Sequence, residues 1–129
     1  MQIAGLDHIV LTVADIERSA RFYEAVLGMR VERFGKGRTA LCFGRQKINL
    51  HEHGREIPPH ADRPTPGSAD LCLITETGLD AAMRHVRDQD VDIIAGPVKR
   101  TGATGPLVSF YFRDPDGNLI EVSNYAKPG

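Results

Sequence analysis

Apolar and polar residues along the first quarter of the chain alternate first with a period of two and then with a helical period. Residues 5–13 alternate and are rich in Ile, Val and Thr, which predicts a strand. The next apolar residues share helical spacing and predict an amphipathic helix: Ile16, Ala20, Tyr23, Val26 and Leu27. Asp15 is placed to cap the start of this helix, and Gly28 to end it.

Three short strands are predicted after this helix, around 29–34, 39–43 and 47–52, because glycines separate short apolar runs there. A stretch rich in Pro and His then covers residues 54–67. It is long for a connection inside a compact domain, so we expect either a linker or a functional flap.

The second half repeats the same order of elements. A strand is predicted at 69–75, followed by a helix capped by Thr77 with Leu79, Ala82, Met83 and Val86 on its inner face. A strand near 91–95 is expected to end at Gly96-Pro97, and a flexible stretch at 100–106 follows. The last prediction is a hairpin of strands 107–113 and 119–125 around the turn Asp114-Pro115-Asp116-Gly117-Asn118, in which Pro and Gly suit the backbone of a turn.

The two halves also resemble each other residue by residue. Residues 7–13 are similar to 69–75, and residues 48–51 are similar to 120–123. Polar residues stand at matching places in these strands, His8 with Asp70 and Asn49 with Glu121. A duplicated unit can bring such residues to a common site, so the repeat itself marks candidate chemistry.

Composition and charge exclude several classes of function. The 129 residues suit about one domain, and 41% hydrophobic and 26% charged residues are ordinary values for a globular protein. The net charge is −1 without a basic block, which argues against a nucleic-acid partner. We expect neither a membrane span nor a secretory signal, and therefore a cytoplasmic protein. Cys42 and Cys72 lie in apolar runs and are expected to be buried free thiols.

Three segments carry a family resemblance: residues 6–13, residues 20–29 and residues 114–122 (Asp-Pro-Asp-Gly-Asn-Leu-Ile-Glu-Val). Together they resemble the vicinal oxygen chelate superfamily, which includes glyoxalase I, fosfomycin-resistance and bleomycin-resistance proteins and extradiol dioxygenases. Residues 38–44, 47–52 and 100–106 are similar to the glyoxalase domain-containing protein 5 subgroup, whose bacterial members are often labelled virulence proteins.

The resemblance implies an α+β fold. It consists of two tandem βαβββ modules that form a cupped mixed sheet with the helices on its outer face. Residues 1–129 would form a single vicinal oxygen chelate domain, with module one at about 1–53, a linker at 54–67 and module two at about 68–126. Two-module relatives usually form homodimers, so we expect a homodimer.

The resemblance also places metal ligands on the first and last strands of the modules. His8 and Glu121 match two of these positions, and Asp70 stands where the family usually has His. Glyoxalase I has a carboxylate where this chain has Asn49. His51, two residues on and on the same strand face, is a candidate fourth ligand.

This donor set suits a divalent ion such as Mn, Fe, Ni, Zn or Mg with open positions for substrate. Such an ion can hold two neighbouring oxygens and stabilise an enediolate, while a nearby side chain moves a proton. Glu121 and His51 are the candidate catalytic residues. From the residues alone, all four side chains also suit ordinary strand positions. Tyr23 is expected in the core, His53 and His60 in loops, and His85 in solvent on the second helix.

The function predicted is a metal-dependent lyase or isomerase of the glyoxalase type that acts on a small molecule with adjacent oxygens. Two alternatives stay open: ring cleavage resembling that of extradiol dioxygenases, and binding of a small molecule without catalysis. Whether the protein is an enzyme is left open with them. Residues 100–106, with Arg113, suit either an anionic substrate group or merely a tight connection between strands.

Overall fold

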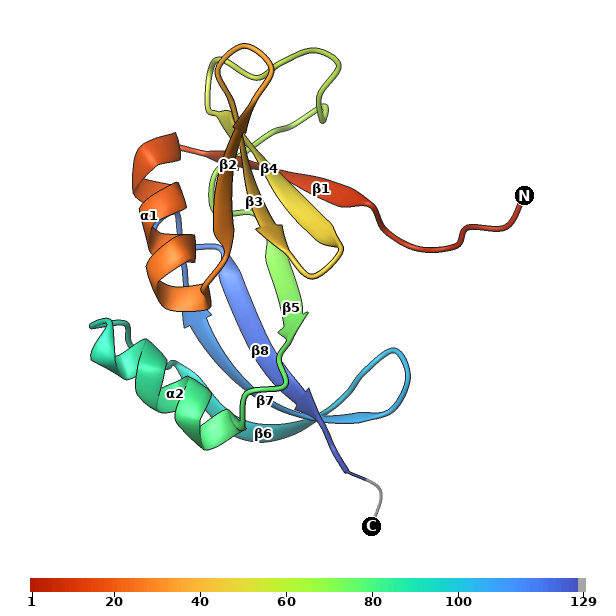
Figure 1. Ribbon diagram of the computed structural model, residues 1–129, viewed down its shortest axis with the longest axis vertical. Coiled ribbons are helices and arrows are strands. Elements are labelled where there is room, and N and C mark those ends of the chain that lie inside the picture. Colours follow the sequence, from red (N-terminus) through yellow and green to blue (C-terminus); the bar gives the residue numbers. More distant parts are fainter. Residues whose placement is uncertain (128–129) are drawn as a thin grey trace. The chain divides into compact units, whose positions relative to one another are not determined.

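The computed structural model describes residues 1–127, and the chain forms two compact units that divide between Gly67 and Ser68. Each unit has a single helix beside a four-stranded sheet of mixed strand direction (Figure 1). The order of elements is strand, helix and three strands in both units, so the predicted α+β fold of two tandem βαβββ modules is confirmed.

The first module contains five elements: β1 (His8–Val13), α1 (Ile16–Leu27), β2 (Arg30–Phe34), β3 (Arg38–Phe43) and β4 (Gln46–Glu52). Its strands lie in the order β1-β4-β3-β2, with β1 parallel to β4 and the other pairs antiparallel. The first strand begins at His8, so the predicted strand over 5–13 is three residues too long at its start.

Helix α1 begins and ends where the sequence predicts. The Asp15 carboxylate accepts a hydrogen bond from the backbone N–H of Arg18, and Gly28 ends the helix with a φ of 66°. The buried side chains of α1 include Tyr23, as expected for a core residue, and the helix contacts β2, β3 and β4.

The two faces of the first sheet differ in character. Alternate residues on the helix side are buried and mostly apolar: Leu11, Val13, Leu41, Ile48 and Leu50. The opposite face carries the residues of the other parity. We call this the open face of module one, and its members are His8, Val10, Thr12, Arg30, Glu32, Phe34, Arg38, Ala40, Cys42, Lys47, Asn49 and His51.

The second module repeats this plan with β5 (Asp70–Ile74), α2 (Leu79–Asp88), β6 (Ala95–Thr101), β7 (Pro106–Arg113) and β8 (Leu119–Tyr125). The order is β5-β8-β7-β6, again with one parallel pair at the edge. Met83 and Val86 of α2 are buried, as predicted. Thr77 does not cap this helix; Gly78 holds the cap position, and the N–H of Thr77 bonds to the Thr75 hydroxyl.

The strand predicted near 91–95 is wrong, because β6 begins at Ala95 and continues through Gly96 and Pro97 to Thr101. Gly96 has a φ of 113°, and a Cβ on it would lie 2.6 Å from the Cα of Phe110. The glycine therefore lets β6 approach β7 closely, at an irregularity in the pairing between Ala95 and Val98.

The turn between β7 and β8 lies where the sequence predicts it. The Asp114 carboxylate accepts hydrogen bonds from the N–H groups of Asp116 and Asn118 and from the Asn118 side chain. Asn118 in turn accepts a hydrogen bond from the N–H of Ala69 at 2.8 Å. These two buried side chains therefore tie the last hairpin to the start of β5.

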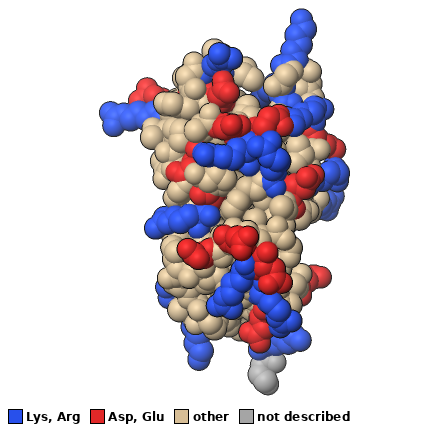
Figure 2. All heavy atoms as spheres, turned by 90° about the vertical axis from the view of Figure 1, so that its left-hand side faces the viewer, with Lys and Arg blue, Asp and Glu red and all other residues tan. Residues whose placement is uncertain are grey.

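Acidic and basic side chains are interspersed over the face shown in Figure 2. Across residues 1–127, the helices are too short or too polar to cross a membrane. Both cysteines are free, but Cys72 is exposed and Cys42 half-buried, so the expectation that both are buried is wrong.

Candidate functional site

The strand registers show which residues of the two modules are equivalent. Val10 pairs with Asn49 in the first module, and Cys72 pairs with Glu121 in the second. Counting from these pairs, His8 corresponds to Asp70, Asn49 to Glu121 and His51 to Ser123. The repeat seen in the sequence is therefore also a repeat of strand pairing.

His8 is the first residue of β1, and its ring is oriented by the preceding residue. Its Nδ1 lies 2.8 Å from a carboxylate oxygen of Asp7. A carboxylate at Nδ1 leaves Nε2 as the nitrogen with a free lone pair, which is the arrangement common in metal-binding histidines. The side chain is 44% exposed, so this nitrogen is accessible.

His51 does not lie near His8 on this face. His51 pairs with Thr12 and His8 pairs with Lys47, so the two histidines stand four residues apart along adjacent strands. That separation is about 13 Å. The geometry thus gives His8 and His51 different surroundings.

His51 is 5% exposed, and neither ring nitrogen has a hydrogen-bond partner among the described residues. It lines a cavity of about 290 Å³ on the open face, the His51 pocket, whose other walls are Val10, Thr12, Pro59, His60, Ala61 and Pro64. Buried polar groups are normally paired, so an unpaired imidazole at a cavity is a candidate binding group.

Burial lowers the pKa of His51 below its ordinary value, and the nearby Arg38 guanidinium and His60 ring lower this pKa further. His51 is therefore neutral at pH 7, with one N–H donor and one acceptor nitrogen. A metal ion is a less suitable occupant here than an anion, because the field of Arg38 opposes another positive charge.

Basic residues outnumber acidic residues on the rest of this open face. The Arg38 guanidinium lies 4.8 Å and the Lys47 ammonium 4.2 Å from the centre of the Phe34 ring. The acid on this face is Glu32, which Arg30 already pairs at 2.9 Å. Three cations therefore share the open face of module one with one carboxylate.

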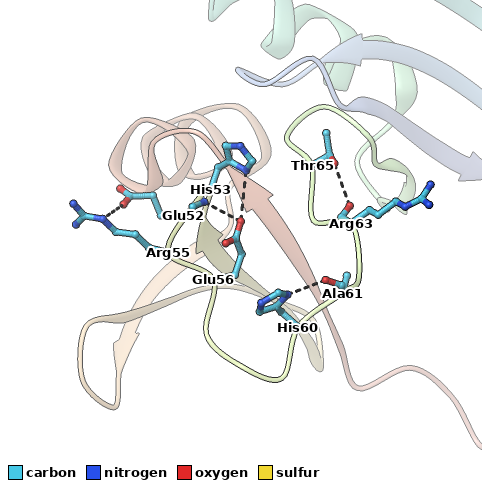
Figure 3. A network of polar contacts seen from close by, with 9 residues as sticks. Glu52, His53, Arg55, Glu56, His60, Ala61, Arg63 and Thr65 are labelled. Atoms are coloured by element: carbon cyan, nitrogen blue, oxygen red, sulfur yellow. Dashed lines mark hydrogen bonds and ion pairs between the residues drawn. The ribbon is translucent and has the colours of Figure 1, made fainter.

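The segment 54–67 forms the wall of the His51 pocket and is held by polar contacts of its own (Figure 3). The Glu56 carboxylate accepts the N–H of Gly54 at 2.9 Å and lies 3.5 Å from the His53 ring. Further along, Nδ1 of His60 lies 2.8 Å from the carbonyl of Ala61. His53 and His60 lie outside the helices and strands, as expected, and both are exposed, although His60 also borders the pocket.

In the second module, Glu121 lies half-buried on the face of β8 that α2 does not cover. The Ser123 hydroxyl donates to it over a long 3.4 Å, and Ser123 also bonds to Ser109 at 2.6 Å. Although Cys72 as a residue is exposed, partial desolvation of its sulfur, together with the nearby Glu121 carboxylate, raises the pKa of the thiol. Asp70 is exposed, and it lies two residues before Cys72, the residue of β5 that pairs with Glu121.

A second cavity, of about 390 Å³, lies on this side of module two and includes Glu121, Cys72 and Arg100. The Nε of Arg100 donates to the Tyr111 hydroxyl at 2.8 Å. The glycine-rich stretch predicted to be flexible connects β6 and β7 as a hairpin, closed by the Gly102 N–H bonded to the Gly105 carbonyl.

No cluster of three His, Cys, Asp or Glu side chains suited to a metal forms within residues 1–127. Each module brings its own donors instead: His8 in one, Asp70 and Glu121 in the other. The sequence interpretation missed the cations Arg38 and Lys47 as functional candidates. The alternation of side chains along a strand was the available signal, because it places Arg38 and Lys47 on the same face of the sheet as His51.

Comparison with known proteins finds relatives that match nearly the whole length of this chain. Residues 5–122 match the model of the Glyoxalase/Bleomycin resistance protein/Dioxygenase superfamily. The virulence protein STM3117 of Salmonella typhimurium is 54% identical over 97% of this chain and 87% of its own length. The glyoxalase domain-containing protein RDO1 of Mycosarcoma maydis is 49% identical over 97% of this chain and 70% of its own length.

Among solved structures, the integron cassette protein VCH_CASS1 from the mobile metagenome of V. cholerae is 63% identical. It superposes with a TM-score of 0.96 over 98% of both chains. More distant relatives include a metallothiol transferase FosB of Shouchella clausii, at 28% identity, and the human mitochondrial methylmalonyl-CoA epimerase, at 25%. On the family match over most of its length, and on relatives that share half of its residues, the chain belongs to the Glyoxalase/Bleomycin resistance protein/Dioxygenase superfamily.

Proposed function

We propose that this protein is a metal-dependent lyase or isomerase of the glyoxalase type. Its substrate would be a small molecule with two adjacent oxygen atoms. The observation that supports this is the repeated donor position, with His8 and Asp70 at the equivalent starts of β1 and β5. Glu121 adds a third donor on the strand paired with β5.

These residues suit a divalent ion by their chemistry. Asp7 leaves Nε2 of His8 available, and the Glu121 carboxylate accepts a long hydrogen bond of 3.4 Å from the Ser123 hydroxyl. An imidazole with two carboxylates leaves coordination positions open for substrate. A bound ion would supply Lewis-acid stabilisation of a developing oxyanion.

The remaining roles fall to side chains of this chain. Glu121, as a carboxylate, is the group proposed to move a proton next to a substrate carbonyl. His51 is proposed to contact substrate rather than to serve as a fourth ligand, since it stands about 13 Å along the strands from His8. We further propose that the protein acts in the cytoplasm as a homodimer.

Calorimetric titration with Mn²⁺, Ni²⁺ and Zn²⁺ tests the metal site. Binding by the wild-type protein should weaken at least tenfold in His8→Ala and Glu121→Ala. His53→Ala and Glu76→Ala, which remove an exposed histidine and an exposed carboxylate, should bind like the wild type. Equal binding by all five proteins, or none by the wild type, would overturn the proposed metal site.

The reaction class needs its own measurement. Proton NMR in D₂O should show metal-dependent exchange of the carbon-bound proton in the hemithioacetal of methylglyoxal and glutathione, or in a related 2-oxo compound. Glu121→Gln should lose this exchange. Exchange that is unaffected by Glu121→Gln would contradict the proposed role of that carboxylate.

A second candidate function is binding without catalysis. The observation that favours it is the His51 pocket, which is formed by residues of module one alone. Protection of a bound compound without any chemical change to it, in protein freed of metal, would support this alternative over the first.

A further inference from the structure

The His51 pocket is lined by both polar and apolar residues. Val10, Pro59, Ala61 and Pro64 line the cavity with apolar side chains, and His51 lines it as a buried imidazole whose ring nitrogens have no partners within the described chain. Its volume of about 290 Å³ is at the small end of ligand sites. A suitable occupant is therefore a small molecule with a short apolar part and a group that accepts a hydrogen bond from imidazole.

The charges next to the pocket favour an anion. Arg38 precedes Thr39, which pairs with Leu50, so Arg38 and His51 are cross-strand neighbours on one face. The guanidinium stacks on Phe34 and forms no ion pair that the structure records for the described residues, which leaves its N–H edge available. The Lys47 ammonium also lies 4.2 Å from the centre of the Phe34 ring, on the same open face but further from His51 along the strands.

We infer that module one binds the carboxylate group of a small organic acid, with His51 donating a hydrogen bond to it and Arg38 providing the compensating charge. Guanidinium and imidazole N–H groups form strong, charge-assisted hydrogen bonds to carboxylates. The apolar walls would take the short carbon chain of the acid. Binding by these residues requires no metal.

This inference extends the proposed function by naming a substrate class. If the substrate also has two adjacent oxygens, the class becomes 2-oxo or 2-hydroxy acids. The link to the proposed function lies only in that step, because the anion site uses none of His8, Asp70 or Glu121.

The test is calorimetric titration of pyruvate into protein treated with a chelator. Pyruvate should bind, and neutral pyruvamide should bind at least tenfold more weakly. Arg38→Gln and His51→Ala should each raise the pyruvate Kd about tenfold or more. Arg45→Gln and His85→Ala, which change an exposed arginine in the turn before β4 and an exposed histidine on α2, should leave the Kd unchanged.

Because His51 is buried, its replacement needs a check on folding, and Arg38→Gln gives an independent answer on a more exposed side chain. Equal binding of pyruvate and pyruvamide, or an unchanged Kd in a folded Arg38→Gln, would overturn the inference, as would no pyruvate binding at all. Pyruvate binding without any metal binding would instead remove only the proposed metal chemistry. Metal binding without pyruvate binding would remove only this inference.

Discussion

At the scale of single residues, buried polar side chains in this protein fall into two kinds. Asp114 and Asn118 are buried with short hydrogen bonds that hold a turn, whereas His51 is buried without a partner in the described chain. Leaving a buried polar group unpaired costs free energy, so the first kind indicates a structural role. The second kind indicates a group kept for something that binds.

Replacing Asn118 with Ala should destabilise the protein by about 2–3 kcal/mol, since it leaves the Asp114 carboxylate and the Ala69 N–H without this partner. Urea unfolding followed by circular dichroism measures the change. Thr104→Ala, at an exposed hairpin position in the same module, should change the free energy of unfolding by less than about 0.5 kcal/mol. A similar loss in both variants would contradict the structural role of Asn118.

The thiol of Cys42 should react slowly with iodoacetamide at pH 8. Burial raises its pKa, and the Glu32 carboxylate that accepts its hydrogen bond raises the pKa further, so little thiolate forms. In a Cys72→Ser background, Glu32→Gln should lower the pKa of Cys42 and speed alkylation several-fold.

The dependence of the alkylation rate on pH gives the pKa of Cys42 directly. Glu24→Gln, which removes an exposed carboxylate on α1, should leave the profile where it was. An identical profile in Glu32→Gln would show that burial alone sets the reactivity of this thiol.

At the scale of elements, the two modules share one plan, but some of their element boundaries are set by local residues and others by packing between strands. Helix α1 begins at a side-chain cap and ends at a glycine with positive φ, both visible in the sequence. Strand β6 instead depends on a close approach to β7 that only glycine permits at position 96. The sequence signal of Gly96-Pro97 predicts the end of a strand, while packing makes it the interior of one.

Gly96→Ala should therefore destabilise the protein by about 3–5 kcal/mol, because its Cβ would meet the Phe110 backbone at 2.6 Å in addition to the strain of positive φ. Gly117→Ala is the matched variant, since Gly117 has a φ of 88° but open space around it. Its cost should be about 1–2 kcal/mol. Thermal unfolding of both variants measures the difference, and equal costs would mean that β6 shifts to relieve the contact.

At the scale of the whole molecule, the open face of module one and the face of β5 and β8 that carries Glu121 hold both the candidate chemistry and exposed apolar side chains. Val10 of β1 is 44% exposed and Ile74 of β5 is 50% exposed. Isolated exposed residues are common, but these two belong to the faces that carry His51 and Glu121.

We expect the chain to be a homodimer in solution, in which a second copy removes such apolar surface from water. Size-exclusion chromatography with light scattering should give twice the mass of one chain at micromolar concentration. Val10→Asp combined with Ile74→Asp should shift the equilibrium toward monomer, whereas Ile3→Asp, outside the sheets, should not. A wild-type protein with the mass of one chain would contradict the dimer.

The sequence by itself determined the order of elements, the caps of α1, the final hairpin and the duplication that makes His8 equivalent to Asp70. These follow from local rules, because periodicity, capping residues and turn residues act over a few positions. The family and its fold also followed from motifs within continuous segments. Only the tertiary structure decided that β6 passes through Gly96, that Cys72 is exposed and that His51 is buried without a partner beside Arg38. These features depend on residues that lie far apart in the sequence, such as Gly96 against Phe110, or His51 and His60 around one pocket, and no local pattern specifies them.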